Sequence, residues 1–320
     1  MENSRYLDCL AADFDRLRAV VPGALTAPVP TCPGWTVADL TRHVAEVYVH
    51  KTLAMRDGAE PEDFPPKGLA DVRMLRSLEG EPGMPRVHVT FLAAHAVPPE
   101  YFGRRHDYID AVGTWCSDAA AVGADSVDVY CEEGRFTERE ARWILSAGRA
   151  AGLLPRVHAC GETRTGAARL AAELGCASAD VLHEAGDEDV AALARAGVAA
   201  VVCPGTALQV GKNPPVRALL DKGVPVALGS DHTPGGTGIT SMPLVIALAV
   251  SQFGLSVAEA LRAATLGGAQ ALRAPDRGGM VRGRFADIVL WDADHEGAFA
   301  WSYGLKPSRV WLGGEPVALS

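Results

Sequence analysis

The chain has 320 residues, of which 48% are hydrophobic and 22% charged, so it is long enough to bury a sizeable core. Thirty lysines and arginines against 39 acids give a net charge of −9, which excludes nucleic acid as an expected partner. Seven scattered cysteines do not form a disulfide framework, and no apolar run reaches the roughly 18 residues of a membrane span. The first residues lack the basic start and apolar run of a secretory signal, so we expect a cytoplasmic protein with no membrane partner.

The beginning of the chain has the apolar spacing of helices, over residues 1–56. Thr36 is a candidate N-cap, and Asp39 stands at the third helical position, which predicts a capping box. A charged, proline-broken linker follows at 57–68. The sequence therefore predicts a separate helical segment over 1–66.

From about residue 85, short β-branched runs alternate with longer amphipathic segments. The predicted strands are 86–94, 125–132, 155–160, 179–184, 198–204 and 224–231. The predicted helices are 107–121, 137–151, 164–175, 187–196, 214–222, 241–252 and 256–273. This alternation predicts an α/β fold with about six parallel strands in a sheet or barrel, over 67–280. Two further strands, 286–292 and 308–314, predict a small antiparallel appendage over 281–320.

Four predicted strands end in a side chain that can bind a metal or move a proton. These side chains are His95, His158, His183 and Asp231. Any one of them alone is better explained as a hydrogen-bonded structural residue or a helix cap. The carboxyl ends of parallel strands converge on one face, and imidazole and carboxylate are ligands that zinc prefers. Together they predict a metal-type site on that face.

Several segments resemble one enzyme family, the imidazolonepropionases, which are amidohydrolases of histidine degradation. The matching segments are FLAAHAVPPEY (91–101), VDVYCEEG (127–134), 171–180, GSDHTPG (229–235), 264–272 and 283–294. The resemblance covers roughly residues 70–320. It implies a (β/α)₈ barrel, which in this chain would be incomplete with about six parallel strands. It also implies one divalent metal, zinc or iron. In this family a His-x-His pair on the first strand, a histidine on the fifth and an aspartate on the eighth hold that metal.

The resemblance also implies roles for individual residues. His158 and Asp231 match the metal ligands of the fifth and eighth strands, and Asp231 would also carry the proton. His95 matches a histidine that contacts the substrate. Thr233 stands where the family has an asparagine, and Gly235 lies in the loop that holds the substrate's propionate. The implied reaction converts the small molecule 4-imidazolone-5-propanoate into N-formimidoyl-L-glutamate by hydrolysis of a cyclic amide.

The chain departs from the family pattern at several positions. It contains no His-x-His, so two metal ligands are missing. Gly161 replaces an acidic or amide residue, and Val181 stands in place of a histidine of the sixth strand. His183 lies two residues further, which in a strand means the same face, so it is a candidate catalytic replacement. The missing ligands predict weak or absent turnover, and a non-catalytic scaffold that binds a small molecule is the alternative.

The beginning of the chain resembles a different family. Residues 27–45 are similar to the metal-binding segment of the mycothiol-dependent maleylpyruvate isomerases, which are DinB-like helical bundles. His43 matches their first metal ligand, but the partner ligands of that family are not present in this chain. The resemblance leaves a mycothiol-dependent isomerase as a third, weaker hypothesis. The oligomeric state is not predicted, and a homodimer stays open.

Overall fold

The computed structural model divides the chain into two compact units, Met1–Phe64 and Pro65–Ser320. The structure describes residues 12, 15–16, 18–19, 21–29, 36–41, 69–81, 83–233 and 236–318. In the first unit, the Asp39 carboxylate accepts the Thr36 backbone N–H at 2.9 Å, and Thr36 Oγ1 accepts the Asp39 N–H at 3.3 Å. The predicted capping box is therefore confirmed. This unit also contains the short 3₁₀ helix η1 (Val21–Gly23), whereas His43 lies outside the described residues.

The second unit is built on a six-stranded sheet in the order β1-β2-β3-β4-β5-β6. Its strands are β1 (Thr90–Ala94), β2 (Ser126–Cys131), β3 (Leu154–Ala159), β4 (Ser178–Val181), β5 (Ala199–Val202) and β6 (Val226–Leu228). Every neighbouring pair is parallel, so the predicted α/β fold with six parallel strands is confirmed. All strands except β3 are shorter than predicted, most of all the first and the last, whereas β3 keeps its six residues and is displaced by one.

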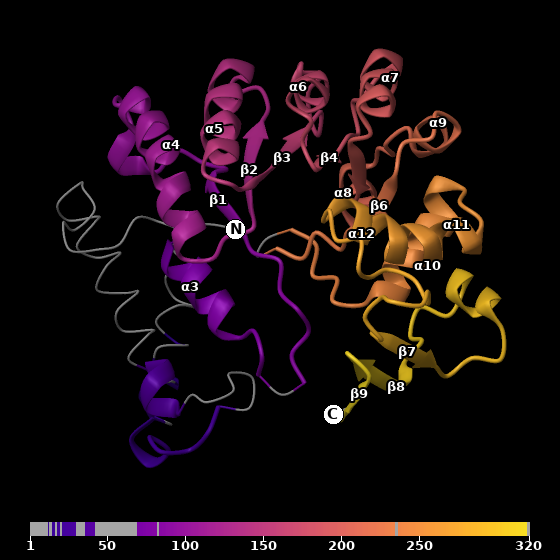
Figure 1. Cartoon of the computed structure of the whole chain (residues 1–320). Helices are drawn as coiled ribbons and strands as arrows, with labels where there is room; N and C mark the ends of the chain where they lie inside the picture. The colour runs from indigo at the N-terminus through magenta and orange to yellow at the C-terminus, as the bar shows by residue number, and fades with distance from the viewer. Residues whose placement is uncertain are drawn as a thin grey trace. The chain divides into compact units, whose positions relative to one another are not determined.

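Helices connect consecutive strands and pack against the sheet, as Figure 1 shows. They are α3 (Leu69–Ser77), α4 (Arg105–Ala121), α5 (Glu138–Ala150), α6 (Ala167–Leu174), α7 (Asp187–Ala196), α8 (Pro204–Val210), α9 (Val216–Asp221), α10 (Met242–Phe253), α11 (Val257–Arg262) and α12 (Gly268–Ala271). The 3₁₀ helices of this unit are η2 (Pro99–Tyr101) and η4 (Glu296–Ala300). None of the helices in the described ranges is long and apolar enough to cross a bilayer.

The helix predicted over 256–273 is not continuous. Between α11 and α12 the backbone forms a π-helical turn, η3 (Ala263–Gly267). A Cβ on Gly267 would lie 2.0 Å from the backbone carbonyl oxygen of Val226 in β6. Glycine is therefore required where this turn approaches the strand, and apolar periodicity does not reveal such a widened turn.

A small antiparallel sheet ends the described chain. Its order is β7-β8-β9, with β7 (Ile288–Trp291), β8 (Pro307–Leu312) and β9 (Glu315–Val317). The predicted antiparallel appendage is confirmed, and β9 is a third strand that the sequence prediction missed. β9 is only three residues long and follows the Gly313-Gly314 turn, so it carries little periodic signal.

The two faces of the parallel sheet differ in chemistry. Val127 of β2 faces α5, where a Cβ on Gly148 would lie 2.3 Å from the valine side chain. Its neighbours in the strand, Ser126 and Asp128, therefore lie on the opposite face, although both are buried. Arg156 of β3 pairs with Asp128 across the ladder and lies on the same face. This polar face of the sheet carries the candidate site.

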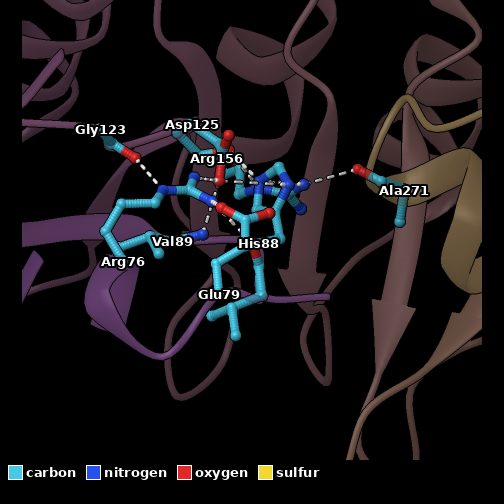
Figure 2. Close-up of polar contacts among 10 residues, drawn as sticks. Arg76, Glu79, His88, Val89, Gly123, Asp125, Arg156 and Ala271 are labelled. Carbon is cyan, nitrogen blue, oxygen red and sulfur yellow. Dashed lines mark hydrogen bonds and ion pairs between the residues drawn. The ribbon is translucent and has the colours of Figure 1, made fainter. Parts of the chain in front are cut away.

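A buried arginine joins three strands at the start of that face (Figure 2). Arg156 donates to Ser126 Oγ at 3.1 Å, to Ser178 Oγ at 2.9 Å and to the Ala271 carbonyl at 2.8 Å. The His88 ring nitrogen Nε2 lies 2.6 Å from Ser126 Oγ and 3.5 Å from the guanidinium. The guanidinium thus holds β2, β3, β4 and the end of α12 together with neutral acceptors.

A second arginine in Figure 2 ties α3 to the same region. Arg76 donates to the Gly123 carbonyl at 2.8 Å and forms an ion pair with Asp125. The Asp125 carboxylate also accepts the Val89 backbone N–H at 2.7 Å. A residue of a helix that the sequence did not predict therefore fixes the start of β1 and β2.

The stability of this region should depend on pH through His88. Burial, with the Arg156 charge second, lowers the His88 pKa from 6.5 to about 4. A histidine with a depressed pKa favours folding above 6.5, and this contribution is lost as pH falls toward 4. The free energy of unfolding of the wild type should therefore decrease between pH 7 and pH 5. We expect His88→Gln to make this decrease smaller by on the order of 1 kcal/mol, allowing for solvent screening. Urea unfolding at both pH values tests this, and equal pH dependence in both proteins would contradict it.

Candidate active site

An imidazole–carboxylate pair lies at the end of β1. His95 follows the last residue of that strand, and its Nε2 lies 2.9 Å from Oδ2 of the buried Asp128 in β2. Burial alone would lower the pKa of His95, but the hydrogen bond and the charge of Asp128 outweigh it and raise the pKa. Burial likewise opposes ionisation of Asp128, yet His95 brings its pKa below the usual range. Each partner therefore favours the charged form of the other, imidazolium for His95 and carboxylate for Asp128.

His158 lies beside this pair in β3. Its ring packs on Tyr130, with 3.8 Å between ring centroids, and Tyr130 in turn lies 5.7 Å from the His95 ring. Burial lowers the pKa of His158 to about 4, so the ring is neutral near pH 7. Its Nε2 is buried and has no hydrogen-bond partner in the described part of the chain. A neutral imidazole with a free nitrogen has the chemistry of a metal ligand or a proton acceptor.

His183 does not lie in a strand. The prediction that it points to the same face as Val181 assumed that it does, and this assumption is wrong. β4 ends at Val181, and Val181 and Leu182 have positive φ angles of 80° and 62°, which break the alternation. The His183 ring instead hydrogen-bonds the Gly161 backbone. A Cβ on Gly161 would lie 2.7 Å from His158 Nε2, so this glycine lies in contact with both histidines.

The ring nitrogen Nε2 of His183 is in the same situation as that of His158. His183 is 4% exposed, and its Nε2 also has no hydrogen-bond partner among the residues that the structure describes. Burial lowers its pKa, so the ring is neutral near pH 7. Two neutral imidazoles therefore present unpartnered nitrogens in the same region.

Asp231 lies three residues beyond β6, which ends at Leu228 rather than at the predicted residue 231. Its φ angle is +49°, so the backbone bends there. Thr206 of α8 donates to its Oδ2 at 2.5 Å, and Thr237 donates to its backbone carbonyl at 2.7 Å. The charge of Asp231 raises the pKa of His158 and of His183 against the effect of burial, which places it within electrostatic reach of both.

The predicted substrate-binding residues after Asp231 are described only in part. Thr233 is exposed, and its carbonyl accepts the Gly236 N–H at 3.0 Å in a tight turn. A Cβ on Gly236 would lie 2.1 Å from Thr233 Oγ1, so a side chain at that position would have to displace the Thr233 hydroxyl. Gly235 lies outside the described residues.

Sequence analysis missed a carboxylate that organises the loop after β3. Glu132 is 4% exposed and accepts hydrogen bonds from the Gly161 and Thr163 N–H groups, the latter at 3.0 Å, and from the Thr163 hydroxyl. It therefore holds the loop that separates His158 from His183. Its position directly after β2 was the signal that could have identified it.

The pair partner Asp128 was also missed, together with a second, half-buried acid, Asp180. Burial, with the Asp128 charge second, raises the pKa of Asp180 to about 7. Oδ1 of each carboxyl group is buried without a hydrogen-bond partner in the described ranges. Alternation of polar residues along buried strands, as in Ser126-x-Asp128-x-Tyr130, is the signal that identifies the polar face.

The donor chemistry of the site suits a divalent metal, but its geometry is incomplete. The two free imidazole nitrogens and the Asp231 carboxylate are the ligand types that zinc prefers. Within the described ranges, however, no three His, Cys, Asp or Glu side chains come together as a group able to hold a metal ion. The described residues thus supply fitting donors without a complete ligand set.

Gly161 offers a direct test of how tightly this region is packed. We expect Gly161→Ala to destabilise the fold by about 1–3 kcal/mol, because the added methyl group displaces the His158 ring from Tyr130. Gly268→Ala is the matched control, since its Cβ meets nothing within 4 Å in a helical backbone. It should stabilise the protein slightly. Chemical unfolding measures both, and equal effects would refute the packing argument.

Comparison with known proteins finds one matching family and several similar sequences. Residues 36–318 match the amidohydrolase family. The imidazolonepropionase of Rhodococcus jostii is 44% identical over 230 residues, covering 71% of this chain and 56% of the relative. The imidazolonepropionase of Rubrobacter xylanophilus is 41% identical over 254 residues, covering 74% of this chain and 61% of the relative. The chain therefore spans only a little more than half the length of these relatives.

Solved structures agree with the fold. An adenosine deaminase from Xanthomonas campestris with bound zinc matches with a TM-score of 0.56 at 21% identity, covering 78% of this chain and 68% of that one. A mutant atrazine chlorohydrolase from Arthrobacter aurescens, complexed with zinc and atraton, gives 0.56 at 18% identity, covering 92% and 80%. At these identities the likeness supports the fold alone.

Proposed function

Because this chain belongs to the amidohydrolase family, we propose that it hydrolyses a cyclic amide as the imidazolonepropionases do. The substrate would be 4-imidazolone-5-propanoate and the product N-formimidoyl-L-glutamate, in histidine degradation. The observation that carries the proposal is the grouping of the His95–Asp128 pair with the neutral His158, and of both with Asp231, whose charge acts on His158. Identity of 44% to an imidazolonepropionase over 71% of the chain supports this choice among amidohydrolase substrates.

The proposal includes one divalent metal, zinc or iron, with His158 and Asp231 as ligands. The unpartnered Nε2 atoms of His158 and His183 support it, and His183 is the candidate for a third donor. When bound, such an ion lowers the pKa of a coordinated water and polarises a carbonyl group. Zinc suits imidazole and carboxylate donors, and iron accepts the same set.

The chain's own residues would divide the remaining chemistry. Asp231, held by Thr206, would take a proton from water and pass it to the leaving nitrogen of the amide. His95, kept charged by Asp128, would donate a hydrogen bond to the polar ring of the substrate. Thr233 and Gly235 would contact the substrate at the turn that follows Asp231.

Ligand number sets the expected rate. His158 and Asp231 alone do not fix a tetrahedral ion with a single open position, and the described donors form no group of three. A loosely held ion activates water less and leaves the attack geometry undefined. We therefore propose that turnover is well below that of an enzyme with a complete ligand set.

The test follows the imidazolone absorbance with purified protein plus zinc or iron. We expect slow loss of absorbance that requires added metal and disappears in His158→Ala. His295→Ala is the matched control, because that ring is 77% exposed and lies in the C-terminal region. Turnover unaffected by His158→Ala would refute the assignment of this residue, and absence of turnover with either metal would refute the proposed function.

A further inference from the structure

A cavity of about 480 Å³ lies at the amino ends of β5 and β6. Ala199, the first residue of β5, and Pro225, directly before β6, form part of its wall. The candidate active site, by contrast, is built from residues at the carboxyl ends of the strands, such as His95 and Asp231. The two ends of a parallel sheet face opposite sides of the domain, so this cavity is a separate site.

The cavity is lined by three arginines, Arg273, Arg277 and Arg284, and by no acid among the described residues. Asp276 neutralises Arg277 with hydrogen bonds of 2.8 and 3.1 Å. Within the described ranges, Arg273 and Arg284 donate only to backbone carbonyls, and neither forms an ion pair with an acid. Two uncompensated guanidinium groups therefore face the same cavity, and the rest of its lining is apolar or uncharged.

A contact to the backbone fixes each of these two guanidinium groups. Arg273 donates to the carbonyl of Cys176, shortly before β4, at 3.1 Å. Arg284 donates to the Arg277 carbonyl at 3.2 Å, and a Cβ on Gly279 would lie only 3.0 Å from its Nη1, so the group packs closely on that loop. A guanidinium has five N–H donors, and these contacts leave most of them for a ligand. The two donors are thus held in place before a ligand binds.

The backbone of Arg273 shows that its side chain is not needed to end the helix. It follows α12 with a φ of +54°, a conformation in which glycine is favoured at a helix end. The Ala274 N–H already closes the helix by donating to the Ala269 carbonyl at 2.9 Å, and Arg156 donates to the Ala271 carbonyl. An arginine at this position therefore costs backbone energy without capping the helix, which points to a use for its guanidinium.

We propose that this cavity binds a small organic phosphate. Its phosphate group would contact Arg273 and Arg284, and its organic part would lie against the apolar wall formed by Leu266, Ala269 and Pro225. A phosphate monoester carries nearly two negative charges near neutral pH and has three strong acceptor oxygens, which two guanidinium groups match in charge and geometry. The site lies at the other end of the strands from the candidate active site, so the inference does not depend on the proposed function.

Titration calorimetry of the full chain without added metal tests the proposal with three probes, which are phenyl phosphate, inorganic phosphate and phenol. We expect phenyl phosphate to bind about tenfold more tightly than inorganic phosphate, and phenol not to bind measurably. Arg273→Gly and Arg284→Gln should each weaken phenyl phosphate binding about tenfold, because each removes one charged donor. Arg262→Gln is the matched control and should change nothing, since this exposed arginine of α11 does not line the cavity.

The thermal unfolding midpoint of Arg273→Gly separates binding from folding. Glycine suits the left-handed backbone, so the midpoint should equal or exceed that of the wild type while binding is weakened. A lower midpoint would show that the bond to Cys176 serves the fold, and it would overturn the inference. Absence of phenyl phosphate binding to the wild type, or binding that persists in Arg273→Gly or falls equally in Arg262→Gln, would overturn it too. Equal affinity for inorganic phosphate would overturn the assignment of an organic ligand.

Discussion

Asp231→Asn is expected to remove the metal-dependent hydrolysis of 4-imidazolone-5-propanoate almost completely, by about 10²–10⁴-fold. The amide keeps the shape of the carboxylate, and its one carbonyl oxygen can still accept the Thr206 hydroxyl, which in the wild type lies 2.5 Å from Asp231 Oδ2. It loses the negative charge and the ability to take a proton. The change therefore removes the proposed base without removing its support.

Folding of this variant can be checked separately. Asparagine tolerates the left-handed backbone that a φ of +49° demands, so the unfolding midpoint should stay close to that of the wild type. Asp294→Asn is a suitable control, because this acid is exposed in the C-terminal region. Steady-state assays with added zinc measure the rates. Hydrolysis that persists in Asp231→Asn would show that another group moves the proton.

Asp128→Asn is expected to lower kcat by about 10²-fold and to shift the pH profile. The hydrogen bond that His95 donates to Asp128, together with the Asp128 charge, raises the His95 pKa despite burial. Once the charge is removed, burial dominates and the His95 pKa falls, so that imidazolium is lost at a lower pH. The alkaline limb of the activity profile should therefore move toward lower pH.

A purely structural role for Asp128 predicts something different. Reduced stability alone would lower activity at every pH, with the limbs of the profile in place. Rates measured from pH 5 to pH 9, together with a titration of His95 by NMR, separate the two cases. A wild-type profile in Asp128→Asn would show that His95 acts independently of the pair.

The overall fold could be predicted because its signals are periodic. Alternating β-branched and amphipathic runs predict about six parallel strands, and the sheet contains six. Failures occurred where tertiary contacts override local pattern. α8 begins at Pro204, at the end of a predicted strand, and α3 is a nine-residue helix pinned by the long-range ion pair of Arg76 with Asp125. Neither is apparent from a short stretch of sequence.

For the site, strand ends identified groups but not their arrangement. His95 follows β1 as predicted, whereas the environment of His183 depends on two left-handed residues that only the structure reveals. The partner residues Asp128 and Glu132 lie on β2 or at its end and act across strands. Such pairings depend on register between strands, which one strand's sequence does not encode. The roles of Thr233 and Gly235 stay predictions.

The left-handed residues at the strand ends have a consequence for engineering heat tolerance. Val181, Leu182 and Asp231 have φ angles of 80°, 62° and 49°, and such a conformation costs on the order of 1–3 kcal/mol in a bulky or β-branched residue and less in aspartate. Leu182 is fully buried, so replacing it with glycine would relieve the backbone strain but leave a cavity in the core. Asp231 is partly exposed, and glycine there relieves the backbone with little packing loss. A screen for thermostable variants would therefore select against the very carboxylate on which hydrolysis is proposed to depend.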